Sequence, residues 1–273
     1  MDKYQVKQGG VEETVLIPLY ARAVETAKTD PALRDPRAVE MVEAIDYDYA
    51  KFDGLPSLGG AVMRTALFDH WTRAFLAEHP DGTVIEVGTG LNTRFERTDN
   101  GRAHWYDLDL PDIIELRRRF FHDTRRRTMI SASVTDPAWP DQVDTGGPYL
   151  ISAEAVLAFL SEESVRSVVQ LVANRFPGAL LAMDTSGTGI VAAQQQHDVL
   201  SKVDAVMNWA CDDPSEVAGW RPGAEVLGSH TLTSLPPELY AALPAAYRAI
   251  VDELVPQQLM QVEQYRMSLI RLP

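Results

Sequence analysis

Two glycines and two carboxylates stand at the spacing that a nucleoside-binding turn requires. Glu86, Gly88 and Gly90 end a short apolar, β-branched run that is typical of a buried parallel strand. Glycine tolerates a positive φ and lets a ligand approach the backbone, while the following helix start offers unpaired N–H groups. Asp109 comes 21 positions after Gly88, about where an acidic side chain binds ribose hydroxyls in such folds. We therefore expect a site for an adenosine-containing ligand at the carboxyl edge of an α/β sheet.

The kind of ligand follows from what this turn lacks. Thr93 stands where the dinucleotide fingerprint G-x-G-x-x-G has its third glycine, and no later pattern indicates a hydride-transfer site. This favours S-adenosylmethionine, whose ribose needs a carboxylate but which has no pyrophosphate to place on a helix N-terminus. From these residues, a nicotinamide-dependent dehydrogenase remains the alternative.

Strand and helix patterns alternate around this turn. Strands are expected at 83–86, 104–109, 128–132, 149–153, 179–184, 224–231 and 263–272. Helices are expected at 14–26, from 36 onward, at 62–78 after a loop at 54–60, and at 111–122, 155–160 and 164–176. Strand–helix alternation from 83 to 184 predicts a doubly wound, parallel sheet.

Four segments with different expected roles follow from these patterns. They are an N-terminal helical segment contributing to the cofactor site (1–82), a cofactor-binding core (83–186), a lid and substrate segment (187–223), and C-terminal strands and helices completing the sheet (224–273). The third segment is polar and helical, and it carries the aromatic and methionine side chains that suit a flat substrate.

Composition narrows the class of protein. The 273-residue chain is 45% hydrophobic, as ordinary globular proteins are. Its formal charge of −14 argues against a nucleic-acid partner, which would require a basic face. Cys211, the one cysteine, permits no internal disulfide, and no apolar run reaches the ~18–20 residues of a membrane span. The first ten residues lack a signal-like apolar region, so we expect a cytoplasmic protein; the scattered histidines predict no metal site.

Several charged residues stand in apolar surroundings. Glu154 lies between an apolar strand and an apolar helical segment, where a carboxylate needs a partner or serves a helix end. Arg22 and Arg64 lie in predicted helices, where most arginines are solvated or form salt bridges. The basic runs 117–119 and 125–127 are expected to form a solvated face.

Three stretches resemble the leucine carboxyl methyltransferase family: Gly-Thr-Gly-Leu-Asn-Thr-Arg (88–94), Trp-Tyr-Asp-Leu-Asp-Leu-Pro (105–111) and Ala-Glu-Ala-Val-Leu-Ala-Phe-Leu (153–160). Residues 17–23, the Arg64 helix, residues 176–178 with Asp184, and residues 209–214 match as well. The resemblance covers about residues 14 to 270 and is greatest to the branch of polyketide-biosynthesis O-methyltransferases. It implies a class I, Rossmann-like fold with seven strands, the last antiparallel, an N-terminal helical segment and a helical lid.

The resemblance also implies roles for individual residues. Arg22 and Arg64 would hold the methionyl carboxylate of S-adenosylmethionine, a task that suits the planar guanidinium. Gly88 would lie against the methionine part, Asp109 would bind the ribose and Glu154 would face the amino end. The remaining residues assigned to the cofactor are Glu86, Gly90, Ser133 and Val134. The sequence departs from the wider family at Asn92, where many members have Asp, and at Ser133, where an acid often meets the adenine.

The implied chemistry is an SN2 transfer of a methyl group from a sulfonium to an oxygen, which leaves S-adenosylhomocysteine. A carboxylate acceptor is already ionised and needs no base, whereas a phenol or enol, with a pKa near 10, does. His197 is the lid histidine placed for that catalytic role, and it would act only on a hydroxyl acceptor; a surface histidine is the simpler interpretation. Because no base constellation is evident, we expect a carboxylate acceptor.

The expected acceptor is a small aromatic or polyketide-type molecule of antibiotic or other secondary metabolism. Its pocket is predicted between the carboxyl edge of the sheet and the lid, lined by Phe159, His197, Met207, Trp209 and Trp220. Both tryptophans could instead be core residues of the lid. Two alternatives remain: methylation of a phenol or enol hydroxyl, and a cyclase-like protein that keeps the cofactor site without methylating. A homodimer also remains open.

Overall fold

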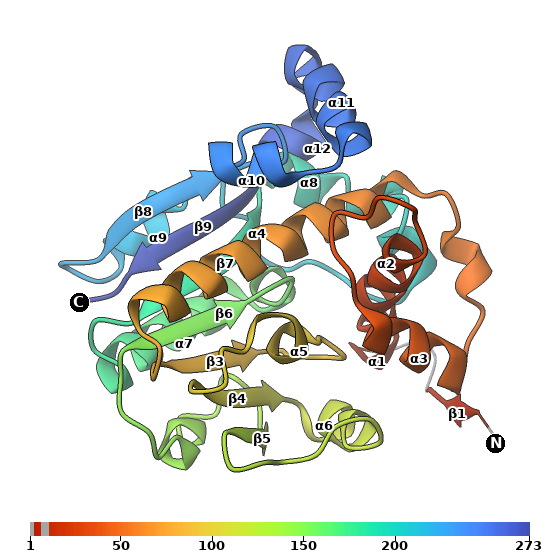
Figure 1. Ribbon diagram of the computed structural model, residues 1–273. Coiled ribbons are helices and arrows are strands. Elements are labelled where there is room, and N and C mark those ends of the chain that lie inside the picture. Colours follow the sequence, from red (N-terminus) through yellow and green to blue (C-terminus); the bar gives the residue numbers. More distant parts are fainter. Residues whose placement is uncertain (1–2, 7–10) are drawn as a thin grey trace.

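A seven-stranded sheet forms the centre of the computed structural model, which describes residues 3–6 and 11–273 (Figure 1). Its order is β5-β4-β3-β6-β7-β9-β8. The strands are β3 (Thr83–Val87), β4 (His104–Asp109), β5 (Arg127–Ser131), β6 (Tyr149–Ala153), β7 (Leu180–Ser186), β8 (Glu225–His230) and β9 (Tyr265–Arg271). Residues 1–2 and 7–10 of the expected N-terminal segment lie outside the described residues.

Strand direction brings the predicted site residues to one edge of this sheet. β3 pairs in parallel with β4 and β6, so that Val87 lies opposite both Leu108 and Ala153. The residues that follow these strands therefore share the carboxyl edge. β9 runs antiparallel to both β7 and β8. The predicted Rossmann-like sheet of seven strands with an antiparallel last strand is confirmed.

Helices cover both faces of the sheet. They are α1 (Val11–Thr14), α2 (Leu16–Thr26), α3 (Pro36–Ala44), α4 (Pro56–Glu78), α5 (Arg94–Thr98), α6 (Pro111–Arg117), α7 (Glu162–Arg175), α8 (Thr188–Ala192), α9 (Ser215–Gly219), α10 (Pro237–Ala242), α11 (Ala245–Leu254) and α12 (Met260–Glu263). A separate pair of short parallel strands, β1 (Tyr4–Gln5) and β2 (Ile45–Asp46), was not expected. No helix of the described residues is long and apolar enough to cross a membrane.

Side chains on the two faces of the sheet pack against different helices. Ile85 and Val87 belong to the apolar cluster that contains α7, whereas Val84 belongs to the cluster that contains α4. Successive side chains of a strand point to opposite faces, so one strand serves both layers. Figure 1 shows α1, α2 and α3 beyond the arrowheads of β3 and β4. The N-terminal helices thus lie at the edge that carries the glycine turn.

Three predicted boundaries were wrong. The expected loop at 54–60 is mostly helix, because α4 begins at Pro56 and continues through two glycines. The expected helix at 155–160 is only a 3₁₀ turn at 157–159, and Ala155 has a φ of +57°. The expected helix at 111–122 already ends at Arg117.

The solvated basic face was also wrong for part of its residues. Arg117 and Arg127 are buried, and both bind the buried Asp107, with Nη2–Oδ2 and Nε–Oδ2 distances of 3.1 and 2.7 Å. Burying a guanidinium is tolerated where a carboxylate accepts its hydrogen bonds. These two arginines are therefore structural, and they fasten β4 to β5 and α6.

Candidate active site

The glycine turn after β3 has the backbone shape that its sequence predicts. Gly88 and Gly90 have φ values of +61° and +49°. A Cβ at Gly88 would collide with Val156 Cγ2, so only glycine fits. Gly90 N donates to Asp109 Oδ2 over 2.7 Å, and Leu110 N donates to Oδ1 over the same distance. The predicted acid is thus in contact with the turn, and burial raises its pKa above the ordinary value.

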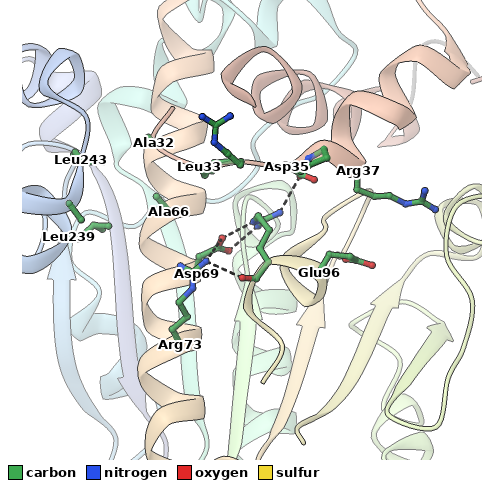
Figure 2. Close-up of a pocket in the computed structure, with 14 residues that line it drawn as sticks. Ala32, Leu33, Asp35, Arg37, Ala66, Asp69, Arg73, Glu96, Leu239 and Leu243 are labelled. Atoms are coloured by element: carbon green, nitrogen blue, oxygen red, sulfur yellow. Dashed lines mark hydrogen bonds and ion pairs between the residues drawn. The ribbon is translucent and has the colours of Figure 1, made fainter. Parts of the chain in front are cut away.

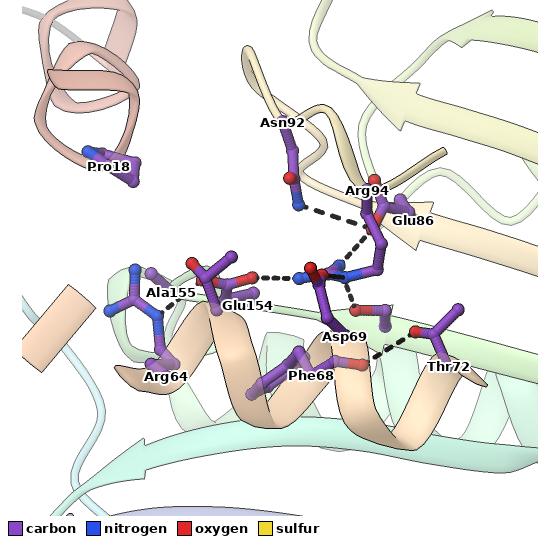
Figure 3. A network of polar contacts seen from close by, with 12 residues as sticks. Pro18, Arg64, Phe68, Asp69, Thr72, Glu86, Asn92, Arg94, Glu154 and Ala155 are labelled. Carbon is purple, nitrogen blue, oxygen red and sulfur yellow. Dashed lines mark hydrogen bonds and ion pairs between the residues drawn. The ribbon is translucent and has the colours of Figure 1, made fainter. Parts of the chain in front are cut away.

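Arg94, at the start of α5, joins three carboxylates beneath the turn (Figure 3). Its guanidinium is 1% exposed and forms ion pairs with Asp69 of α4, Glu86 of β3 and Glu154 beyond β6. The Nε–Oδ1 distance to Asp69 is 3.0 Å, and Nη1 donates to Ser152 Oγ over 3.1 Å. No role was predicted for Arg94 from the sequence. Its signal was indirect, since two buried glutamates near an apolar strand require a cation.

Arg64 of α4 approaches the same glutamate from the other side. Its Nε donates to Glu154 Oε1 over 2.8 Å, and its Nη1 donates to the hydroxyl of Tyr265 over 3.1 Å. Tyr265 in turn donates to Asp184 Oδ2 over 2.6 Å. The backbone N–H of Ala155 donates to the other oxygen of Asp184 over 2.6 Å. These bonds connect α4, the turn after β6, β7 and β9 into one polar network.

The two glutamates of this network differ in how readily their carboxyl groups ionise. Burial disfavours ionisation of Glu154, but Arg64 and Arg94 outweigh it and hold its pKa well below the usual range. Burial dominates at Glu86 and raises its pKa despite Arg94. Glu86 Oε2 has no hydrogen-bond partner among the described residues. The site therefore holds one firmly ionised carboxylate and one with an unused buried oxygen.

Arg22 supports the turn from α2. Its side chain is 3% exposed; Nε binds Asp35 Oδ2 over 2.8 Å and Nη2 donates to the carbonyl oxygen of Leu91 over 2.7 Å. Both predicted arginines therefore lie around the glycine turn. Within the described residues, each nitrogen of the Arg22 guanidinium donates to Asp35 or to a backbone oxygen, whereas Arg64 donates to Glu154 and Tyr265.

Ser133 and Val134 lie beyond β5, next to the acid at the end of β4. Asp109 and Ser131 are partners in the sheet, and Ala132 N donates to the carbonyl oxygen of Asp109 over 3.0 Å. Val134 is buried, while Ser133 makes a hydrogen bond within its own loop. The structure thus brings both residues to the predicted edge.

The predicted acceptor residues separate into two groups. Phe159 and Met207 pack in one small apolar cluster that also contains Tyr265. His197 adjoins this cluster, since its Nδ1 accepts the backbone N–H of Leu200, a cluster member, over 3.2 Å. Burial lowers the pKa of His197.

Trp209 and Trp220 pack elsewhere. Their ring centroids are 6.1 Å apart, and both belong to the cluster between the sheet and α7. Trp209 is 4% exposed. The structure therefore does not bring the two tryptophans together with the other three predicted acceptor residues.

A cavity of the described residues lies away from the glycine turn. It has a volume of about 330 Å³ and lies between α3, α4, α5 and α10 (Figure 2). It includes none of the residues predicted to bind cofactor or acceptor, although Asp69 in its wall also binds Arg94. The described residues contain no group of His, Cys, Asp and Glu that could hold a metal ion.

Comparison with known proteins connects this geometry to one family. The model of the family described as leucine carboxyl methyltransferase matches residues 16–173. The chain is 30% identical over 220 residues to the tetracenomycin polyketide synthesis O-methyltransferase TcmP of Streptomyces glaucescens, covering 80% of this chain and 82% of that protein. It is 26% identical over 247 residues to the S-adenosyl-L-methionine-dependent methyltransferase dpfgK of Gibberella zeae, covering 82% and 83%.

Solved structures show the same fold at low identity. A DUF574 family protein from Streptomyces avermitilis superposes with a TM-score of 0.63 at 14% identity, covering 95% of this chain and 97% of that chain. The plantazolicin methyltransferase BpumL in complex with SAH gives a TM-score of 0.52 at 9% identity, covering 96% and 98%.

Proposed function

Because the chain belongs to the leucine carboxyl methyltransferase family and is an S-adenosylmethionine-dependent O-methyltransferase, we propose that it methylates a carboxylate of a small aromatic, polyketide-type molecule. The single observation that supports a carboxylate acceptor is the hydrogen bonding of the His197 ring. Its Nδ1 accepts the N–H groups of Val199 and Leu200, each over 3.2 Å. With these bonds the proton of a neutral imidazole lies on Nε2, so Nε2 has no lone pair to deprotonate a hydroxyl. The opposite tautomer would donate from Nδ1 to Asp198 Oδ1, which is also 3.2 Å away, and the His197→Gln variant below distinguishes the two.

The polar network supports binding of the methionyl end of the cofactor. Arg64 and Glu154 pair with each other beside the glycine turn, at 13% and 9% exposure. An amino-acid zwitterion carries the complementary charges, so Arg64 would bind its carboxylate and Glu154 its ammonium group. The unused Oε2 of Glu86 offers a further acceptor. The charge balance of the site would be kept when the zwitterion binds.

The adenosine end would lie along the carboxyl edge beyond this network. Asp109 would accept hydrogen bonds from the ribose, and Ser133 and Val134 would border the adenine. Bound S-adenosylmethionine supplies an electrophilic methyl group, and the chain's own contribution is alignment and exclusion of water. No side chain needs to exchange a proton with a carboxylate acceptor.

The apolar cluster of Phe159, Met207 and Tyr265 supports the place of the acceptor. Tyr265 belongs both to this cluster and to the network of Arg64, so the cluster adjoins the methionyl end. Met207 is held there by Gln194, whose Oε1 accepts the Met207 N–H over 2.7 Å. Apolar and sulfur-containing walls suit a flat aromatic substrate. We place Trp209 and Trp220 outside this pocket, because they pack toward α7.

The reaction product distinguishes the two oxygen acceptors. With S-adenosylmethionine and an aromatic acid that also carries a phenol, we expect a methyl ester, which mild alkali hydrolyses back to the acid. Mass spectrometry before and after alkali measures this. An alkali-stable methyl product would instead indicate an ether and overturn the carboxylate proposal. Failure to form S-adenosylhomocysteine with any acceptor, despite cofactor binding, would favour the cyclase-like alternative.

The pH dependence provides a second test. The acceptor carboxylate is ionised, and the lowered pKa of His197 keeps its imidazole neutral, so kcat should stay constant between about pH 6.5 and 9. We expect His197→Gln to retain kcat within roughly threefold, because removing a true general base costs about 10²–10⁴-fold. A rate that rises with pH toward the pKa of a phenol, or a loss of that size in the variant, would contradict the proposal.

The free, buried Cys211 supports a reducing compartment, and we propose the cytoplasm as the place of action.

A further inference from the structure

The cavity between α3, α4, α5 and α10 has the size of a ligand site. Its volume of about 330 Å³ lies at the lower end of the range for small-molecule pockets, ~300–1,000 Å³. Figure 2 shows it on the side of α4 that carries Ala66, Asp69 and Arg73. Those residues follow at intervals of three and four, so they share one face of the helix. Arg64 and Glu154 are not among the lining residues, so the cavity is separate from the proposed cofactor site.

The negative charges of the cavity wall are already neutralised. Its three acidic residues each bind an arginine: Asp35 with Arg22 at 2.8 Å, Asp69 with Arg97 at 2.7 Å, and Glu96 with Arg127 at 2.6 Å. Arg97 lines the cavity itself, whereas Arg22 and Arg127 are not among its lining residues. No unpaired carboxylate therefore opposes an anion inside the cavity.

Positive charge remains at the mouth. Arg34 is exposed and forms no ion pair within residues 3–6 and 11–273; its Nη2 reaches only the carbonyl oxygen of Thr29, at 3.5 Å. Arg73 is 56% exposed; its Nη2 donates to the carbonyl oxygen of Arg97 over 3.2 Å and lies 3.8 Å from Asp69 Oδ2. In a chain of formal charge −14, Arg34 and Arg73 thus bring two largely exposed positive charges to one cavity.

Apolar side chains form the rest of the wall. Leu33 and Leu243 are buried, and Leu239 of α10 lies beside them, as Figure 2 shows. Such walls take up an apolar body by removing its surface from water. The cavity thus combines an apolar wall with a cationic mouth, which is the complement of an amphipathic anion.

We propose that this cavity binds a small organic anion with an apolar body, such as an aryl carboxylate, at a site separate from the cofactor and acceptor sites. The guanidinium groups of Arg34 and Arg73 hold the anionic group, and the leucines contact the apolar body. The inference does not depend on which oxygen the enzyme methylates.

The test uses 2-naphthoate as the probe and calorimetry in the presence of saturating S-adenosylhomocysteine. Besides any probe in the proposed acceptor pocket, we expect one 2-naphthoate molecule per chain to bind at the cavity, and the uncharged 2-naphthamide to bind there roughly tenfold more weakly or worse. The double variant Arg34→Glu/Arg73→Glu should weaken 2-naphthoate binding by roughly tenfold or more. Arg118→Glu/Arg119→Glu changes the net charge equally on the exposed end of α6, and it should leave binding unchanged.

A steric variant makes the test independent of charge. Ala242→Trp, at an exposed lining position of α10, should block the probe while the melting temperature and S-adenosylhomocysteine binding are retained. Probe binding that is seen without S-adenosylhomocysteine but is lost when S-adenosylhomocysteine is saturating would place the probe in the cofactor site and overturn the proposal. So would equal weakening in the control pair, equal affinity for the amide, or no binding at about 1 mM probe.

Discussion

Replacing Arg94 by Met is expected to lower the free energy of unfolding by about 3–5 kcal/mol, because it leaves the buried Glu86 without its paired cation and removes one arginine each from Asp69 and Glu154. The guanidinium is 1% exposed and pairs with Asp69, Glu86 and Glu154, themselves 2%, 2% and 9% exposed. Methionine approximates the length of the side chain, so the loss reflects charge more than volume. Urea unfolding of the variant and the parent protein measures it.

The direction of the pH dependence separates this cause from a packing defect. Without Arg94, Glu86, whose pKa burial already raises, should have a pKa still further above that of the unfolded chain, whereas Glu154 keeps its ion pair with Arg64. The deficit should then be largest at high pH and shrink as pH falls and Glu86 takes up a proton. A deficit independent of pH would indicate packing instead. Arg102→Met, which removes an exposed pair with Asp81, is the control and should leave the free energy of unfolding nearly unchanged at every pH.

Replacing Arg64 by Ala is expected to weaken S-adenosylhomocysteine binding by about 2–4 kcal/mol, or roughly 30- to 1,000-fold. The variant leaves both Glu154 and the incoming methionyl carboxylate without the guanidinium that the proposed site supplies. Arg64→Lys should recover only part of the affinity, because an ammonium group lacks the planar fork. Calorimetry with S-adenosylhomocysteine gives each value.

Tyr265→Phe is the matched control for Arg64. It keeps Arg64 and its bond to Glu154 but removes the hydroxyl that accepts from Arg64 and donates to Asp184. We expect it to cost no more than about 1.5 kcal/mol of cofactor affinity. If Arg64→Ala lowered only the melting temperature and left the affinity intact, Arg64 would be a structural partner of Glu154 and not a ligand of the cofactor.

The sheet was predictable because each of its strands is a short apolar run with its own local signal. The run before Gly88, for example, is apolar on both faces, as a strand covered by α4 and α7 must be. The segment at 155–160 has equally apolar residues, yet it does not form a helix. The hydrogen bond from Ala155 N to Asp184 accompanies the left-handed backbone there, and its partner lies 29 positions away. A bond to so distant a partner cannot be predicted from the residues next to Ala155.

The candidate site was predictable in its glycines and its acid but not in its central cation. Gly88 and Asp109 belong to a local pattern whose spacing has a physical reason. Arg94, in contrast, owes its burial to Asp69 and Glu154, 25 and 60 positions away. An arginine with distant partners has the same local sequence as an exposed one. The general preference for exposed arginines therefore gave the wrong environment for Arg117 and Arg127 as well.

The position of β9 between β7 and β8 makes the pairing of β8 depend on the C-terminal residues of the chain. Residues 225–230 pair in the sheet only with residues 265–271, and they precede them in the sequence. Until β9 docks, β8 has no neighbour and the edge of β7 is open to pairing with other chains. Docking of β9 therefore completes its hydrogen-bond ladders with β7 and β8 together, and such non-local pairing slows folding. Chains cut before residue 265 would keep the glycine turn but expose an unpaired, aggregation-prone strand edge.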